Sequence, residues 1–191
     1  MDYLGKKPST VVDLGCGTGL STVVWENKSE KVIGIDPNGD MLAEAENKGN
    51  SSISFIKAFS DDTTLPNLTA DIVVCSQSFH WMEPHSTLTE VNRILKPNGI
   101  FAAVDCDWPP VCDWRAEKEY MAFMAKTHQI QHTNAEMRSS FRRWDKNEHL
   151  SNIKNSGYFR YSREIVFLNQ ENCNAERFSN MAFSKSAVQK I

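Results

Sequence analysis

Residues 10–19 read Thr-Val-Val-Asp-Leu-Gly-Cys-Gly-Thr-Gly, so a short apolar run closes on three alternating glycines. A β-branched run bounded by glycine is typical of a strand, and the apolar residues at helical spacing over 20–25 predict a helix after it. The turn between them lets a ligand approach the backbone, because a Cβ at Gly15 or Gly17 would collide with that ligand. This stretch predicts a strand, a tight turn and a helix around a bound molecule.

The same unit repeats through the first half of the chain. Further short apolar strands are expected at 31–35, 53–58, 71–75 and 100–104, and helices at 41–48 and 88–95. Strands that alternate with helices are typical of right-handed crossovers and of a parallel sheet covered on both faces. We therefore expect an α/β fold with a doubly wound, mostly parallel sheet, in which ligands bind beyond the carboxyl ends of the strands.

The second half of the chain changes character after the fifth expected strand. Residues 1–107 are expected to form the cofactor-binding α/β core, and residues 108–150, rich in Met, Trp and Arg, a helical insertion that acts as a lid. Residues 151–191 are expected to return to the core, with a sixth strand at 161–168 and a terminal helix from 174. A length of 191 residues is typical of one domain, so we expect one domain overall.

Composition excludes several classes of function. The chain has 21 Lys and Arg against 24 Asp and Glu, a formal net charge of −3, which argues against a nucleic-acid-binding surface. It has no run of about 18 apolar residues, so no membrane span is expected. The five cysteines are odd in number and irregularly spaced, which favours reduced thiols in a cytoplasmic protein. The oligomeric state is left open.

An acidic residue at the end of the second expected strand narrows the class of ligand. Asp36 lies 23 residues after Asp13, where a carboxylate can accept hydrogen bonds from both ribose hydroxyls of a nucleoside. A helix N-cap is the structural alternative for Asp36. A dinucleotide fingerprint would need glycine at position 20, which is Leu20, and no G-K-[ST] follows the glycines as in a P-loop. The pattern therefore favours a phosphate-free nucleoside that bears an amino acid, and it disfavours a nicotinamide-dependent oxidoreductase.

These motifs resemble those of class I S-adenosylmethionine-dependent methyltransferases. The resemblance rests on Asp-Leu-Gly-Cys-Gly-Thr-Gly at 13–19, on Asp36 and on Leu-Lys-Pro-Asn-Gly at 95–99, and it runs from about residue 11 to residue 105. The segment 71–81 is similar to the type-11 small-molecule group, including trans-aconitate methyltransferases. The resemblance implies a Rossmann-like methyltransferase fold, S-adenosylmethionine as the cofactor, and methyl transfer to O or N, including a carboxylate, of a small-molecule acceptor.

The resemblance also implies which residues hold the cofactor. It places Gly15 and Gly17 against the methionine part with Asp13 in the same motif, Asp36 at the ribose, Ser60 and Asp61 near the adenine, and Gln77 near the methionine end. Residues 58–61 read Ala-Phe-Ser-Asp, which departs from the commoner Gly-Asp-Ala pattern, so a contact of Asp61 with adenine is left open.

A histidine at the ligand-binding edge is the candidate catalytic residue. His80 follows the fourth expected strand, and an imidazole titrates near neutrality, so His80 is the candidate general base for a hydroxyl or amine acceptor. A carboxylate acceptor needs no base, and His80 would then orient it. The structural alternative is a capped strand end, and Trp81 beside it is expected to pack in the core.

No metal site is expected from the sequence. His128 and His132 have the i, i+4 spacing of a zinc-binding helix, but Gln129 stands where a metalloprotease has glutamate, and no third ligand is evident. Cys106 and Cys112 have no Cys-x-x-Cys partner and are expected to be structural. Three arginines on a predicted helix are expected to form a solvated face, with a clamp for a substrate carboxylate as the alternative: Arg138, Arg142 and Arg143.

The two ends of the chain bear on the expected function. The first strand begins about ten residues in, so the N-terminal helix of similar enzymes is expected to be missing, and no seventh strand is expected at the other end. We therefore expect a fragment or a shortened relative, truncated at both ends. The alternative to a methyltransferase is a catalytically silent module that binds S-adenosylmethionine or a partner.

Overall fold

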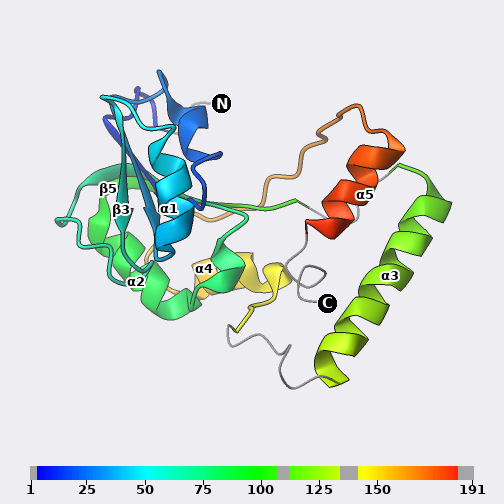
Figure 1. Ribbon diagram of the computed structural model, residues 1–191. Coiled ribbons are helices and arrows are strands. Elements are labelled where there is room, and N and C mark those ends of the chain that lie inside the picture. Colours follow the sequence, from blue (N-terminus) through cyan, green and yellow to red (C-terminus); the bar gives the residue numbers. More distant parts are fainter. Residues whose placement is uncertain (1–3, 107–111, 134–141, 185–191) are drawn as a thin grey trace. The chain divides into compact units, whose positions relative to one another are not determined.

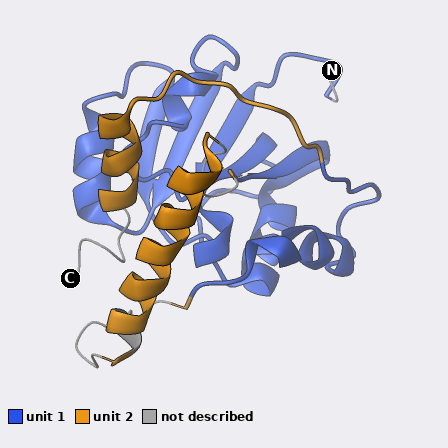
Figure 2. Ribbon diagram, turned by 90° about the vertical axis from the view of Figure 1, so that its right-hand side faces the viewer, with its two compact units in different colours: residues 1–105, 143–164 blue, residues 106–142, 165–191 orange. Residues whose placement is uncertain are grey.

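The computed structural model describes residues 4–106, 112–133 and 142–184 of the chain. They fall into two compact units, which Figure 2 distinguishes by colour. The first unit comprises residues 1–105 and 143–164, and the second comprises residues 106–142 and 165–191. Residues 143–150, which were expected in the helical insertion, therefore belong to the unit that holds the sheet.

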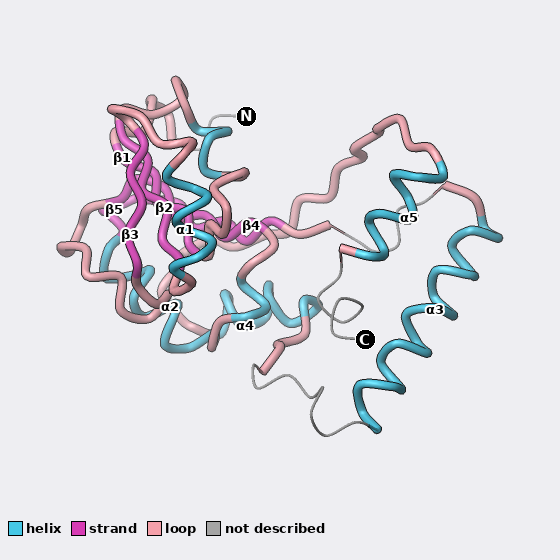
Figure 3. Tube along the Cα trace, in the orientation of Figure 1, coloured by secondary structure: helices cyan, strands magenta, loops and turns pink. Residues whose placement is uncertain are grey.

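The first unit is built on five strands. They are β1 (Thr10–Leu14), β2 (Lys31–Asp36), β3 (Ile53–Lys57), β4 (Ala70–Ser76) and β5 (Leu95–Val104). Their order is β3-β2-β1-β4-β5 and every pair is parallel, which confirms the doubly wound α/β fold (Figures 1 and 3). The direction of strand addition reverses between β1 and β4, so the ligand-binding switch point lies at the carboxyl ends of these two strands.

Helices and single turns follow the strands of this unit. They are the 3-10 turn η1 (Thr22–Trp25), α1 (Gly39–Glu46), the 3-10 turn η2 (Phe79–Trp81), α2 (Pro84–Ile94), the 3-10 turn η4 (Lys146–Glu148) and α4 (His149–Asn155). The helix expected over 20–25 thus forms only as a 3-10 turn. The helices expected at 41–48 and 88–95 are present as α1 and α2.

Alternate residues of the strands supply two cores, one on each face of the sheet. On one face, Val12 of β1 joins a core that contains Leu88 and Val91 of α2. On the other face, Val11 joins a core against which Val23 of η1 packs. Successive strand side chains point to opposite faces, and both faces are covered as a parallel sheet requires.

The sixth strand expected at 161–168 is not formed. Residues 161–174 lie in no helix or strand, and Val166 and Leu168 are 84% and 81% exposed. Their apolar and β-branched pattern is compatible with a strand, but a strand also needs a hydrogen-bonded partner. None of the described strands pairs with this segment.

The second unit contains two described helices. α3 (Trp114–Thr133) lies in the expected insertion, and α5 (Ala175–Phe183) begins one residue after the position expected for the terminal helix. The rings of Tyr120 and Phe178 are 5.7 Å apart between centroids, and those of Phe123 and Phe183 are 6.3 Å apart, so aromatic contacts join α3 to α5. Among the described residues, we find no helix with the length and apolar character needed to span a bilayer.

Candidate functional site

The glycine turn after β1 serves two separate purposes. Gly15 has a φ of +68°, and a Cβ on it would lie 2.5 Å from the Cβ of Ser78, so this glycine permits close packing against the segment after β4. The Ser78 hydroxyl donates to the carbonyl oxygen of Leu14 at 2.6 Å and holds that packing in place. A Cβ on Gly17, whose φ is +54°, would meet no heavy atom of the described chain within 4 Å. Space for a ligand is therefore found at Gly17, whereas a Cβ on Gly15 would meet the protein itself, and a contact of the Gly15 backbone with the cofactor stays a prediction.

Asp36, at the end of β2, joins the glycine turn to the start of α1. Its Oδ2 accepts a hydrogen bond from the backbone N–H of Gly17 at 2.9 Å, and its Oδ1 accepts one from the N–H of Asn38 at 2.8 Å. Asn38 caps α1, because its side chain accepts from the N–H groups of Asp40 and Met41, so the N-cap alternative for Asp36 is wrong. A carboxylate has about four acceptor sites, so Asp36 keeps acceptor capacity for two hydroxyl groups.

Asp13 is fully buried near the end of β1. Its Oδ2 accepts hydrogen bonds from Ser21 Oγ at 2.6 Å and from Thr22 Oγ1 at 2.7 Å, which fixes η1 against the strand. Burial raises the pKa of Asp13 in spite of these two hydrogen bonds. Its Oδ1 is buried and has no hydrogen-bond partner in the described part of the chain. A buried acceptor without a hydrogen bond lowers the stability of the fold. A hydrogen-bond donor on a bound molecule would satisfy Oδ1.

The loop after β3 presents Ser60 and Asp61 differently. The Oγ of Ser60 lies 3.0 Å from Oγ1 of Thr87, so this hydroxyl ties the loop to α2. Asp61 is exposed to solvent. Phe59, which precedes them, is 65% exposed, although large aromatic side chains are mostly buried. A contact of Ser60 or Asp61 with adenine stays a prediction.

Gln77, directly after β4, has a strained backbone. Its φ is +55°, a value uncommon for residues other than glycine, and its N–H donates to the carbonyl oxygen of Val104 at 2.9 Å. The side-chain Oε1 accepts from Nζ of Lys146 at 2.8 Å, whereas Nε2 is buried without a partner among the described residues. Because strained residues concentrate at functional sites, the backbone of Gln77 and its unpaired Nε2 agree with the predicted contact with a ligand, which stays a prediction.

His80 lies in a cluster of four polar side chains at the same edge of the sheet. The members are His80 on η2, Asp105 directly after β5, Lys146 on η4 and His149 at the start of α4. Nδ1 of His80 is 3.6 Å from Oδ1 of Asp105, and Nε2 of His149 is 3.2 Å from Oδ2. Nζ of Lys146 is 2.7 Å from Oδ1. The structure thus surrounds one carboxylate with three basic side chains.

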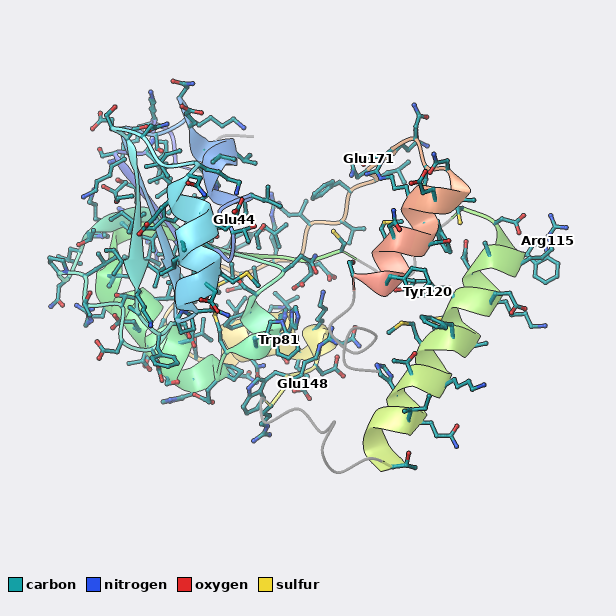
Figure 4. The ribbon with its side chains drawn as sticks, in the orientation of Figure 1. Glu44, Trp81, Arg115, Tyr120, Glu148 and Glu171 are labelled. Carbon is teal, nitrogen blue, oxygen red and sulfur yellow. The ribbon has the colours of Figure 1, made fainter. Side chains whose placement is uncertain are left out.

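The segment that follows residue 142 holds this cluster together. The N–H of Trp144 donates to the carbonyl oxygen of His80 at 2.8 Å. The guanidinium of Arg143 lies over the ring of Trp81, 5.4 Å from its centroid. Trp81 is 46% exposed, so the expectation that it packs in the core is wrong. Figure 4 labels Trp81 and Glu148, which mark the two chain segments that meet here.

Asp105 stays ionised because of its neighbours. Burial would raise its pKa, but the contacts with His149, His80 and Lys146 outweigh burial and hold the pKa well below its usual value. The imidazoles are less well satisfied. Nδ1 of His80 and both ring nitrogens of His149 are buried, and within the described residues none of them has a partner with hydrogen-bond geometry. The cluster therefore combines a fixed negative charge with buried imidazole nitrogens that lack a hydrogen-bond partner among the described residues.

The next residues considered from the sequence are exposed or lie outside the described part of the chain. Cys106 and Cys112 are free and exposed, and His128 on α3 is exposed. The His132 side chain and Arg138 lie outside the described residues.

Sequence reasoning missed three of the four cluster members. Asp105 could have been identified from the sequence, because it directly follows the fifth strand, just as Asp36 ends the second strand. Lys146 and His149 could not, because no spacing relates them to the strand ends.

The sequence of this chain is similar to those of known proteins. Residues 12–103 match the family model described as a methyltransferase domain. The probable S-adenosylmethionine-dependent methyltransferase CRG1 of Saccharomyces cerevisiae is 36% identical over 99 residues, which are 49% of this chain and 34% of that protein. An uncharacterized methyltransferase of Synechocystis is 32% identical over 111 residues, which are 53% of this chain and 52% of that protein.

The fold comparison agrees with the sequence comparison. The solved structure of the YcgJ protein of Bacillus subtilis superposes with a TM-score of 0.60 at 17% sequence identity, over 98% of this chain and 80% of that one, and has the same fold. The chain spans about half or less of the length of the two curated relatives. In its parallel sheet, its glycine turn and the match over residues 12–103, the chain is similar to the S-adenosylmethionine-dependent methyltransferases.

Proposed function

We propose that this chain transfers the methyl group of S-adenosylmethionine to an oxygen or nitrogen atom of a small-molecule acceptor. The observation that carries the proposal is the meeting of the Gly17–Asp36 turn and the His80 cluster at one edge of the parallel sheet. When bound, S-adenosylmethionine supplies a sulfonium methyl that is already electrophilic. The protein therefore contributes mainly placement, and proximity of well-oriented reactants lowers a barrier by about 7–11 kcal/mol.

The proposed cofactor-binding residues fit a nucleoside that bears an amino acid. Asp36 has acceptor capacity for the two ribose hydroxyls, and Gly17 leaves space at the backbone. The unpaired Oδ1 of Asp13 suits an ammonium group, and the unpaired Nε2 of Gln77 suits a carboxylate, which are the two charged groups of the methionine part. Three further residues complete the proposed set: Gly15, Ser60 and Asp61.

His80 is proposed to contact the acceptor. As a neutral imidazole it would take the proton of a hydroxyl or amine acceptor, and it would orient a carboxylate acceptor instead. A catalytically silent module would gain nothing from a buried His80 with an unpaired ring nitrogen, which costs stability. This feature favours turnover over a purely binding role.

Calorimetric titration of the purified chain tests the cofactor half of the proposal. We expect micromolar binding of S-adenosylmethionine and S-adenosylhomocysteine and no binding of NAD. An acceptor panel of alcohols, amines and carboxylic acids, read out as S-adenosylhomocysteine formation, then tests turnover. Failure to bind S-adenosylmethionine would overturn the proposal, and binding without turnover across the panel would favour the silent module.

A further inference from the structure

We propose that His80, Asp105 and His149 form a binding site for a divalent transition-metal ion. One possible ligand atom from each of the three residues lies within 4.8 Å of the others. Nδ1 of His80 is 3.6 Å from Oδ1 of Asp105, and Nε2 of His149 is 3.2 Å from the other carboxylate oxygen, Oδ2. Donor atoms around a tetrahedral ion with bonds of about 2.0–2.1 Å are about 3.3–3.4 Å apart. Small side-chain movements would therefore bring the three donors to one ion.

The unpaired nitrogens show that this cluster lacks a ligand. His80 and His149 are 4% and 8% exposed, and both present buried ring nitrogens that have no hydrogen-bond partner among the described residues. Buried polar atoms are nearly always satisfied in folded proteins, and an exception calls for an explanation such as a bound ion. An ion that binds these nitrogens together with the charged Asp105 would satisfy all three side chains at once.

The donor set indicates the kind of ion. Imidazole nitrogens suit zinc, cobalt and nickel, whereas magnesium and calcium prefer oxygen ligands. Three protein ligands leave a coordination position for another molecule, as in catalytic zinc sites. The site does not depend on the proposed methyl transfer. In the metal-bound form His80 is a ligand and no longer a free base, so the two proposals assign it different roles that can be tested apart.

The ammonium group of Lys146 competes with the ion for the carboxylate of Asp105. This ammonium lies 2.7 Å from Oδ1 of Asp105 and 2.8 Å from Oε1 of Gln77. A positive charge at that position repels any cation that shares the same carboxylate. The Lys146 side chain is 23% exposed and has a flexible stem, so it can move into solvent when the ion binds. Removal of the ammonium should therefore strengthen metal binding.

The experiment uses the full chain with its three exposed cysteines, Cys106, Cys112 and Cys173, replaced by serine, so that thiols do not bind the ion. The chain is stripped with EDTA and titrated with Co²⁺, followed by calorimetry and by visible absorption. We expect one ion per chain, with the absorption of a low-coordinate site. His149→Gln should abolish this binding, and His85→Gln, an exposed histidine on α2, should leave it unchanged.

The gain of affinity is the decisive result. Lys146→Met should bind Co²⁺ at least about tenfold more tightly, which a misfolded variant cannot do. The proposal is overturned if Co²⁺ does not bind, if His149→Gln binds it as the parent does, or if Lys146→Met shows no gain. Titration of the same preparations with S-adenosylmethionine separates the two proposals, because cofactor binding without Co²⁺ binding removes only the metal site.

Discussion

The Gly17–Asp36 turn and the His80 cluster are built in opposite ways. In the turn, Gly17, Asp36 and Asn38 lie within 21 residues of one another in the sequence, and both carboxylate oxygens of Asp36 already accept backbone hydrogen bonds. On the acceptor side, His80, Asp105 and His149 come from three distant segments, and both imidazoles keep buried nitrogens that the described residues leave unpaired.

The Gly17–Asp36 turn is already organised before a ligand arrives, and the His80 cluster is not. Backbone hydrogen bonds hold the Gly17–Asp36 turn in shape, whereas the two imidazoles of the acceptor side complete their hydrogen bonding only when something binds to them. Substitutions on the cofactor side should therefore change stability or cofactor affinity. Substitutions on the acceptor side should change turnover and leave cofactor affinity intact.

Replacement of His80 tests this division with the largest expected effect. His80→Ala should lower kcat by about 10²–10⁴, the usual contribution of a positioned proton-transfer group. Its affinity for S-adenosylmethionine should stay the same, because Asp36, which is proposed to hold the ribose, ends β2, whereas His80 lies on η2 after β4. The checks are steady-state kinetics with the best acceptor of the panel and calorimetry, with His85→Ala as the control. A parallel loss of cofactor affinity would show that His80 supports cofactor binding as well as turnover.

Substitutions of Gly15 and Gly17 separate an effect on fold stability from an effect on cofactor binding within the turn. Gly15→Ala should destabilise the fold by about 2–5 kcal/mol, since a left-handed backbone costs about 1–2 kcal/mol and the contact with Ser78 adds about 1–3 kcal/mol of overpacking. Gly17→Ala should cost only the first part, about 1–2 kcal/mol, but should weaken cofactor binding. Urea unfolding without ligand separates the two. Equal destabilisation would show that the space at Gly17 is not free for a ligand.

Replacement of Asp36 is expected to have the next largest effect, on cofactor affinity. Asp36→Ala should weaken S-adenosylmethionine binding by about 1–3 kcal/mol, as expected for lost charge-assisted hydrogen bonds. The matched control is Asp40→Ala, an exposed carboxylate in the first turn of α1. Calorimetry of both variants checks the prediction, and an unchanged affinity in Asp36→Ala would remove Asp36 from the site.

The smallest effect is expected at the opposite end of the strands. Asp71 accepts hydrogen bonds from the N–H groups of Ser9 and Thr10 and pairs with Lys6 and Lys96. Burial would raise its pKa, but the hydrogen bonds from Lys96, Thr10 and Lys6 outweigh burial and lower the pKa from 3.8 to about 2. The carboxylate is ionised in the folded state at higher acidity than in the unfolded state, so it stabilises the fold above about pH 4 and loses this effect towards about pH 2.

Thermal unfolding across this pH range checks the prediction. Asp71→Asn should have a lower Tm than the parent chain at neutral pH, and the two curves should converge as the pH falls towards about 2. Cofactor affinity at neutral pH should be unchanged. A constant Tm difference down to the lowest pH would show that the Asp71 charge does not stabilise the fold.

Prediction from sequence succeeded where the physics is local. The five strands and the position of Asp36 at the end of the second strand follow from apolar patterns over a few residues, and the structure confirms these positions. The same reasoning failed at 161–168, where the residues suit a strand but no described strand pairs with them. It also placed Trp81 in the core, whereas Trp81 is half exposed and lies under Arg143.

The α/β class, the glycine turn after the first strand and the position of His80 after the fourth strand were predictable from the sequence alone, because each rests on residues that are neighbours in the chain. Only the tertiary structure decided that Asp105, Lys146 and His149 surround His80. His80 and His149 are 69 residues apart, and no local rule relates them. They meet because the strand order β1-β4-β5 brings the ends of β4 and β5 side by side, and because the segment after residue 142 folds back onto that edge.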